Sequence, residues 1–168
     1  MAVEAAHSEH VSIGVHGSVL IMVWSQSPTM EDFGMVESAT NDLIARTPGG
    51  IGLLIIVAEG ADKPPPQEVR RRNAELVARY QGKIWGQARV IEGTGVKLGM
   101  LRFVFSTIDL LSNSSLKETT VENVADAAAW LCNLQPRLHE RALVSDVERL
   151  RRGAPGGKVV ERPTARPR

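Results

Sequence analysis

Three carboxylates follow two strand-like runs in this sequence. Glu59 and Asp62 come just after the aliphatic run 51–58, and Glu92 follows the run 84–91. If both runs are parallel strands, their carboxyl ends meet at one edge of a sheet, where open α/β sheets bind ligands. Carboxylates at such an edge could act as general acid and base or hold a divalent cation. Solvated loop acids are the more common arrangement, and we identify no nucleophile or histidine that would complete a reaction.

The residues after Glu92 could bind an anion. Gly93, Thr94 and Gly95 precede an apolar helical run, and Lys97 lies close by. Free backbone N–H groups and the positive end of a helix dipole favour a negatively charged ligand. The segment GlyThrGlyValLysLeuGly has one residue too many for the dinucleotide-binding GxGxxG pattern and lacks the phosphate-loop ending. A tight turn capped by Thr94 is the commoner alternative. The candidate ligand-binding residues are Glu59, Asp62, Gly93, Thr94, Gly95 and Lys97.

The histidines and the cysteine do not form a recognisable site. His7, His10, His16 and His139 are spaced too irregularly for a metal site, so ordinary surface positions are the favoured interpretation. The single cysteine, Cys132, cannot form an internal disulfide, which favours a reducing compartment. It lies in an apolar helical stretch, which is typical of a buried structural thiol. The sequence therefore predicts no metal and no cofactor.

A basic cluster lies in the middle of the chain. Arginines 70–72 and Arg79 share one predicted helix, and such a cluster could contact nucleic acid or phospholipid headgroups. Glu68 and Glu75 are interspersed among them, and aromatic residues for base stacking are few. A solvated helix face is the favoured interpretation, so the sequence does not favour nucleic acid as the partner.

The elements that must position these residues are organised around the run 51–58. It has no polar alternation, which is typical of a strand covered on both faces. The other elements are predicted from periodicity, caps and breakers. They are a hairpin from strands 10–15 and 19–24, a helix to residue 46 capped by Ser27, a helix 66–81, a strand 84–91, a helix 96–113, a short strand 117–119 and a helix capped by Thr120.

This order predicts an α/β fold. The sheet is mostly parallel, with an N-terminal β-hairpin and flanking helices in the order ββαβαβαβα, plus a C-terminal helix. We expect a flexible segment 1–8, a domain 9–134, a helix within 135–152 and a disordered basic tail 153–168. Residues 1–134 carry 11 Lys or Arg and 15 Asp or Glu, whereas residues 135–168 carry 9 and 4. The positive charge therefore belongs to the C-terminal part of the chain.

Two segments carry a resemblance to a known family. The segment ValIleGluGlyThrGly, which opens a long apolar helix, and the terminal ThrValGluAsnValAlaAspAlaAlaAlaTrpLeu, together with the element order, resemble the STAS domain. The chain looks like bacterial STAS-like proteins related to anti-sigma-factor antagonists and to CRAL-TRIO lipid-binding domains, over residues 9–134. The phosphorylated hydroxyl of the antagonists has no counterpart, because no serine or threonine lies between Ile51 and Pro66. The resemblance implies a non-catalytic module that binds a protein partner or a small apolar or anionic ligand.

The predicted helix 96–113 has more apolar surface than one stripe requires. Met100, Phe103, Leu110 and Leu111 lie outside the main apolar stripe. This surplus indicates a second covering, which could be another helix of the chain, a second copy in a homodimer or a lipid-like ligand. These four residues are the candidate interaction surface.

The favoured function is that of a regulatory module, not an enzyme, which acts through contacts with a protein partner. The alternative is a carrier or sensor for a small anionic or lipid-like molecule seated against Thr94, Gly95 and Lys97. A hydrolase that uses the loop carboxylates is the least favoured hypothesis. The first residues lack an apolar signal region, and charged residues interrupt the longest apolar stretch, 96–111. We therefore expect a cytoplasmic protein without a membrane span.

Overall fold

The computed structural model describes residues 3–61, 63–93, 99 and 116–153. Within these residues the strands form one sheet in the sequential order β1-β2-β3-β4-β5-β6. Strands β1, β2 and β3 pair antiparallel, and β3 to β6 pair parallel. The predicted α/β fold with a mostly parallel sheet and an N-terminal hairpin is therefore confirmed. The strands are β1 (Val3–His7), β2 (Val11–His16), β3 (Val19–Trp24), β4 (Ile51–Val57), β5 (Ile84–Ile91) and β6 (Glu118–Val121).

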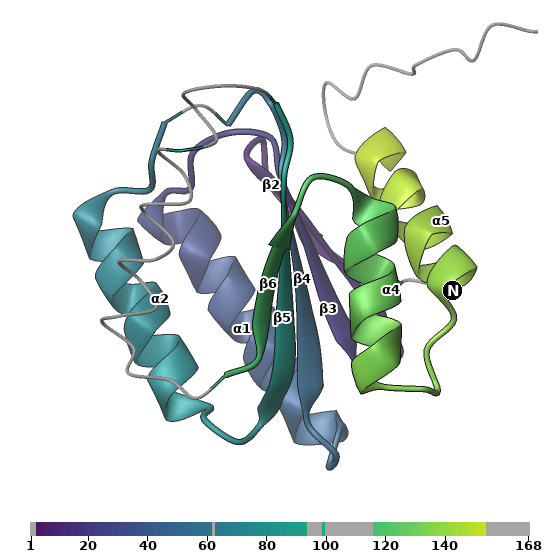
Figure 1. Cartoon of the computed structure of the whole chain (residues 1–168). Helices are drawn as coiled ribbons and strands as arrows, with labels where there is room; N and C mark the ends of the chain where they lie inside the picture. The colour runs from purple at the N-terminus through teal and green to yellow at the C-terminus, as the bar shows by residue number, and fades with distance from the viewer. Residues whose placement is uncertain (1–2, 62, 94–98, 100–115, 154–168) are drawn as a thin grey trace, which may run out of the picture.

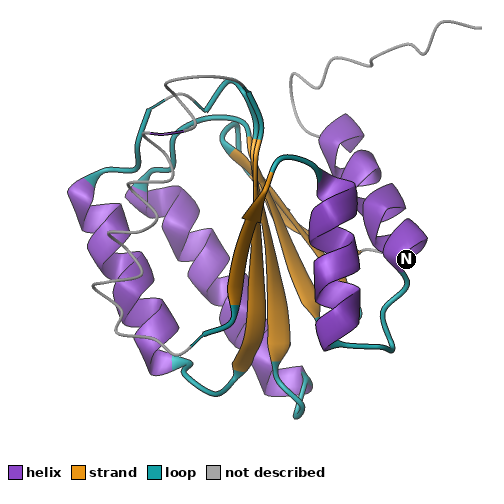
Figure 2. Cartoon of the chain, in the orientation of Figure 1, coloured by secondary structure: helices purple, strands orange, loops and turns teal. Residues whose placement is uncertain are grey.

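The helices cover the two faces of the sheet in pairs. Helices α1 (Met30–Arg46) and α2 (Gln67–Arg79) lie on one face, and α4 (Val124–Leu134) and α5 (Glu140–Gly153) lie on the other (Figure 1). The same layers are visible when the chain is coloured by secondary structure (Figure 2). Parallel crossovers are almost always right-handed, so two crossovers that advance in the same direction place their helices on the same face. This is why α1 and α2 lie together.

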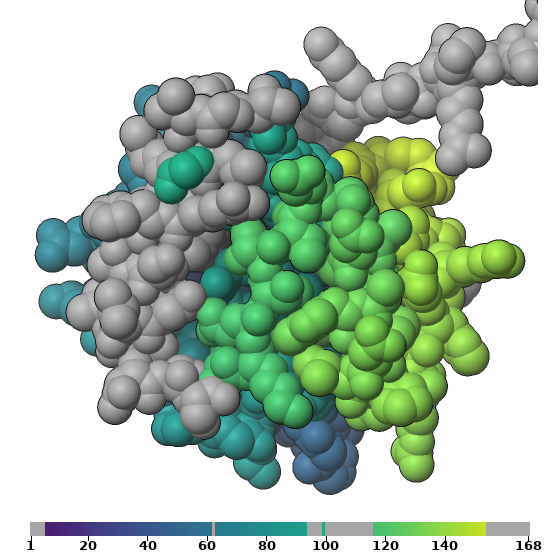
Figure 3. Space-filling model, viewed as in Figure 1, coloured from purple at the N-terminus to yellow at the C-terminus, as the bar shows by residue number. Residues whose placement is uncertain are grey.

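Strand β4 is buried from both sides, as predicted. Leu54, on the face covered by α4 and α5, packs with Leu131 and Leu143. Leu53, on the opposite face, packs with Val36 and residues around it from α1. The residues from β6 to α5 form a continuous surface on the side shown in Figure 3. None of the helices among the described residues combines the length and the apolar character that a membrane span needs.

The first strand corrects the prediction of a flexible segment 1–8. Residues Val3–His7 form an edge strand that pairs with β2, with an irregularity between Glu4 and Ala6. The segment has a weak local preference for strand, because it contains alanines and a glutamate. The edge of β2 presents unpaired backbone N–H and C=O groups. Hydrogen bonds with these groups stabilise the strand, which the local sequence alone only weakly favours.

Two predicted helix caps were also wrong. Helix α1 is capped by Thr29 and not by Ser27, since Thr29 and Asp32 form a reciprocal capping box. Helix α4 is capped by Asn123 and not by Thr120, whose backbone continues strand β6. In both cases the cap that forms has a carboxylate three residues later, Asp32 or Asp126, which favours that register at the helix N-terminus.

Ionisable side chains are also present on the face that α4 and α5 cover. His16, predicted to lie on the surface, is buried, and its Nδ1 donates to Asp146 Oδ2 at 2.6 Å. The prediction was wrong because the partner lies on α5, far away in the sequence. Cys132 is partly buried in α4, where burial and the nearby Glu140 raise the pKa of its thiol. The C-terminal helix is confirmed as α5, whereas the predicted helix 96–113 and most of the tail 153–168 lie outside the described residues.

Candidate functional site

A cavity of about 90 Å³ lies between the sheet and the helices α1 and α2. Its walls come from β3, β4 and β5 on one side and from both helices on the other. Most of the walls are apolar. Six of the apolar side chains are Met22, Trp24, Phe33, Leu53, Ile55 and Val69. A cavity of about 150 Å³ with similar walls is large enough for benzene, and this one is smaller, so it admits an apolar body of only a few carbon atoms.

Helix α2 forms the outer wall because it is fastened to α1. Glu37 of α1 accepts hydrogen bonds from Arg72 and Arg79 of α2, at 3.1 Å and 2.7 Å. Burial raises the pKa of Glu37, but the two arginines outweigh it and lower the pKa below its usual value. Phe33 of α1 also packs against Val69 of α2 in a small apolar cluster. These contacts hold α2 beside α1, with the cavity between α2 and strands β4 and β5.

Strand β5 brings two polar residues into this apolar site. Gln87 and Arg89 alternate with Ala88 and Val90, which face the other side of the sheet, and both polar side chains are almost fully buried. The Arg89 guanidinium donates to Glu118 of β6 at 2.9 Å. When the Gln87 amide oxygen faces Arg89, it accepts from Nε at 3.0 Å. The charge of Arg89 is thus compensated within the fold, as a buried charge requires.

Further polar groups lie on the α2 side of the cavity. Lys63 comes from the loop before α2, and Arg70 and Asn73 lie one turn apart on the helix, so they share its cavity-facing side. The Nε of Arg70 is buried and has no hydrogen-bond partner among the described residues. A buried donor without an acceptor costs about 1–3 kcal/mol, so this guanidinium marks a place for an acceptor.

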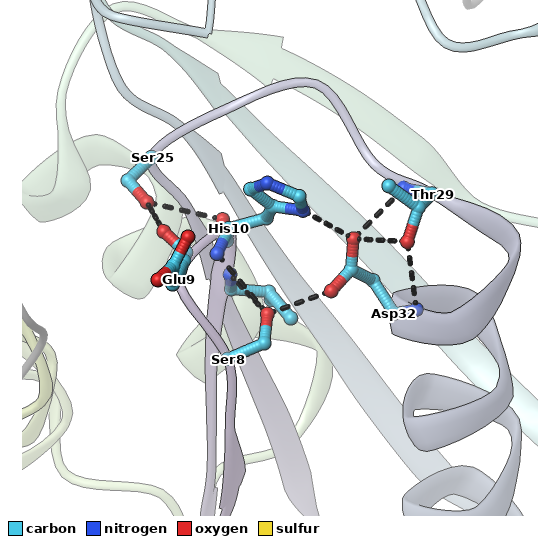
Figure 4. Close-up of polar contacts among 7 residues, drawn as sticks. Ser8, Glu9, His10, Ser25, Thr29 and Asp32 are labelled. Atoms are coloured by element: carbon cyan, nitrogen blue, oxygen red, sulfur yellow. Dashed lines mark hydrogen bonds and ion pairs between the residues drawn. The ribbon is translucent and has the colours of Figure 1, made fainter.

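The loop between β3 and α1 completes the cavity and is held at both ends. Gln26, Ser27 and Pro28 line the cavity. At one end, Ser25 Oγ donates to the backbone oxygens of Glu9 and His10, at 3.0 Å and 3.1 Å. At the other end, Asp32 and Thr29 form the capping box of α1. Figure 4 shows that these contacts converge from the start of β2, the end of β3 and the first turn of α1.

Asp32 is the centre of this anchor. Its carboxylate accepts from Ser8 Oγ at 2.7 Å, from His10 Nδ1 at 2.7 Å, and from the backbone N–H and the Oγ1 of Thr29 at 2.8 Å and 2.7 Å. Burial by itself raises the pKa of Asp32, but the hydrogen bonds from Ser8, Thr29 and His10 outweigh it and lower the pKa from 3.8 to about 2. Because Ser8 donates to Asp32 and not to His10, the arrangement is that of an anchor and not of a nucleophile with its base.

The structure places the predicted site residues away from the cavity, where it describes them. Glu59 is exposed and lies beside Gly93. A Cβ atom added at Gly93 would lie 3.5 Å from Glu59 Cγ. Glu92 pairs with Arg151 of α5. Neither Glu59, Glu92 nor Gly93 is among the residues that line the cavity. The other candidates lie outside the described residues: Asp62, Thr94, Gly95, Lys97, Met100, Phe103, Leu110 and Leu111.

The sequence analysis missed Gln87 and Arg89, although a signal was present. The run 84–91 was identified as a strand, and these two residues stand two positions apart in it. Residues i and i+2 of a strand point to the same face. Two polar side chains on one face of a strand that helices cover on both sides indicate a polar spot within the buried layer. The contribution of Arg70 could not be seen, because it depends on how α2 packs.

No comparison with known proteins identifies the chain. Protein families, curated proteins and solved structures were compared with it, and none matches. The resemblance to STAS-like domains therefore stays a prediction. In the described part of the chain, no three His, Cys, Asp or Glu side chains come close enough together to hold a metal ion.

Proposed function

We propose that this protein is a binding module that takes a small, largely apolar molecule into the cavity between the sheet and helix α2. One observation carries the proposal: an apolar cavity that contains a few buried, well-positioned polar groups, which is the usual composition of a small-molecule site. Gln87 and Arg89 supply the polar groups from a rigid strand, and the anchored loop 25–29 supplies one wall.

The proposal is for binding without chemical conversion. The described polar groups that line the cavity include amides, the hydroxyls of Ser27 and Thr40, which donate to backbone oxygens of Pro64 and Val36, and the cationic side chains of Lys63, Arg70 and Arg89. Such groups orient a ligand and balance its charge. The role of a carrier or sensor fits this composition, and the ligand must be small enough for a cavity of about 90 Å³.

Two other hypotheses keep their place as predictions. A regulatory role through a protein partner depends on Met100, Phe103, Leu110 and Leu111, and a hydrolase depends on Glu59, Asp62 and Glu92 acting together. The first group and Asp62 lie outside the described residues. Glu92 is engaged by Arg151. No described contact favours either hypothesis over ligand binding.

Filling the cavity tests the proposal. Ala61 lines the cavity and is buried, so Ala61→Phe places a phenyl ring in a space of about 90 Å³. Ala78→Phe is the matched control, because Ala78 is an exposed residue of α2 that does not line the cavity. We expect the wild type and Ala78→Phe to bind 1-pentanol, measured by NMR titration of the labelled full chain, and Ala61→Phe to lose at least tenfold in affinity.

Two results would contradict this function. One is a wild-type chain that does not bind 1-pentanol and retains no small molecule in native mass spectrometry after gentle purification. The other is binding that Ala61→Phe and Ala78→Phe leave equally intact, because the probe would then bind elsewhere. Thermal unfolding of each variant confirms that the chain is folded before the affinities are compared.

A further inference from the structure

We propose that the molecule bound in the cavity is an anion with a small apolar body, such as a short carboxylate, and that Arg70 binds its charged group. This inference rests on the proposed function and names the class of ligand. It starts from the charges around the cavity. The described ionisable residues that line it are Lys63, Arg70 and Arg89, all cationic, and no described Asp or Glu lines it.

The three cations differ in whether the fold already compensates them. Arg89 is paired with Glu118 at 2.9 Å. Lys63 is exposed to solvent, where a positive charge needs no partner. The Nε of Arg70 has neither an acidic partner nor contact with solvent: it is buried and has no hydrogen-bond partner among the described residues. The missing acceptor is therefore at Arg70.

The other arginines of α2 show that Arg70 is exceptional in its own helix. Arg72 and Arg79 pair with Glu37 of α1. Arg71, whose side chain is 78% exposed, lies 3.9 Å from Glu75. Each of these three has an acidic neighbour on the outer surface of the helix pair. Arg70 instead lines the cavity and has no acidic partner among the described residues, so it is the arginine of α2 that is available to a ligand there.

A carboxylate fits this position better than a neutral group. Guanidinium and carboxylate match in geometry and can form two parallel hydrogen bonds, and such charge-assisted bonds are about twice as strong as neutral ones. Asn73, one turn after Arg70, also lines the cavity and can donate a further hydrogen bond to the same group. The apolar walls of β3 and β4 then receive the carbon chain, so the ligand has an anionic end toward α2 and an apolar end toward the sheet.

Matched probes test the inference. Pentanoate and 1-pentanol have the same carbon chain and differ in charge, and acetate has the charge without the chain. They are titrated into the labelled full chain and followed by NMR. We expect pentanoate to bind about tenfold or more tightly than 1-pentanol, because a hydrogen bond to a charged group exceeds a neutral one. Acetate should bind much more weakly than pentanoate, since it fills none of the apolar space.

Variants of α2 then assign the preference to a residue. Arg70→Gln should reduce the preference for pentanoate to less than threefold while 1-pentanol still binds. Arg71→Gln, which removes an exposed charge from the neighbouring position, should leave the preference unchanged. Equal affinities of the wild type for pentanoate and 1-pentanol would overturn the inference and leave the proposed function standing. So would a preference that survives in Arg70→Gln.

The failures of the two proposals are distinguishable. If neither probe binds to the wild type, both the proposed function and the inference are wrong. Should Arg70→Gln fold poorly, Arg70→Lys is the substitute variant, because lysine keeps the charge and lacks the planar guanidinium. The comparison of pentanoate with 1-pentanol in the wild type then decides by itself whether the site prefers an anion. Acetate that binds as tightly as pentanoate would indicate an adventitious anion only and would also overturn the inference.

Discussion

The hydrogen bonds to Asp32 make a measurable prediction about acid stability. The carboxylate of Asp32 is almost fully buried and accepts four hydrogen bonds that join Ser8, His10 and Thr29 to the first turn of α1. Asp32→Asn keeps the size of the side chain but replaces an acceptor oxygen by a donor. The variant should therefore lose the stabilisation that depends on the negative charge.

The magnitude follows from the pKa of Asp32. One pKa unit corresponds to about 1.4 kcal/mol, so a pKa lowered from 3.8 to about 2 stabilises the ionised folded state by about 2.4 kcal/mol at neutral pH. Because the folded-state pKa is the lower one, this contribution is complete above the unfolded-state value and is lost as the pH falls through about 2. At pH 3 about 1.3 kcal/mol of it should remain.

Urea denaturation of the wild type and Asp32→Asn at pH 7 and pH 3 measures this. We expect the variant to be about 2 kcal/mol less stable at pH 7, equivalent to about 4–8 °C in melting temperature, and the difference to shrink by about 1 kcal/mol at pH 3. Asp42→Asn, at an exposed position of the same helix, is the control and should show neither effect. A destabilisation by Asp32→Asn that is the same at both pH values would refute the electrostatic reasoning.

Two further predictions concern turns and buried pairs. Gly50 has a φ of +79°, and a Cβ there would lie 2.6 Å from the backbone oxygen of Lys83, whereas Gly49 has nothing within 4 Å. Gly50→Ala should therefore lower the free energy of unfolding by about 1–3 kcal/mol, and Gly49→Ala should change it by less than about 0.5 kcal/mol, both measured by urea denaturation. Asp146→Ala removes the acceptor of the buried His16, so it should destabilise the fold by about 1–3 kcal/mol in the same assay, and a neutral result would show that His16 finds another partner.

The sequence allowed those elements to be predicted whose cause is local. Strand β5 spans Ile84–Ile91 as predicted, because Gly82 follows the preceding helix and most residues from Ile84 to Ile91 are apolar. Strand β4 was recognised from its uninterrupted aliphatic run, which required cover on both faces. The hairpin β2–β3 followed from the break at Gly17, whose φ of +57° is suited to a tight turn. In each case the deciding residues lie within a few positions of the element.

The features that were missed depend on partners far away in the chain. Strand β1 pairs with the edge of β2, and the buried His16 donates a hydrogen bond from its ring N–H to Asp146, 130 positions later. The anchor at Asp32 joins residues that are 22 and 24 positions apart. Local periodicity carries no information on such pairs, because each partner alone looks like an ordinary polar residue of a turn or helix.

The candidate site lies under α2 and reaches the loops that follow β3 and β4, whereas Glu59 and Glu92, the described carboxylates predicted to act at the strand ends, do not line it. Ligands bind at the carboxyl ends of an open sheet where the strand order reverses, because helices there leave toward opposite faces and open a crevice. Here β3, β4 and β5 follow one another without reversal, and α1 and α2 both lie on the same face. Glu92, which follows β5, pairs with Arg151 of α5. The space for a ligand comes from the packing of the helix layer against the sheet. It lies where Glu37 of α1 binds two arginines of α2 and where α2 covers Gln87 and Arg89 of β5.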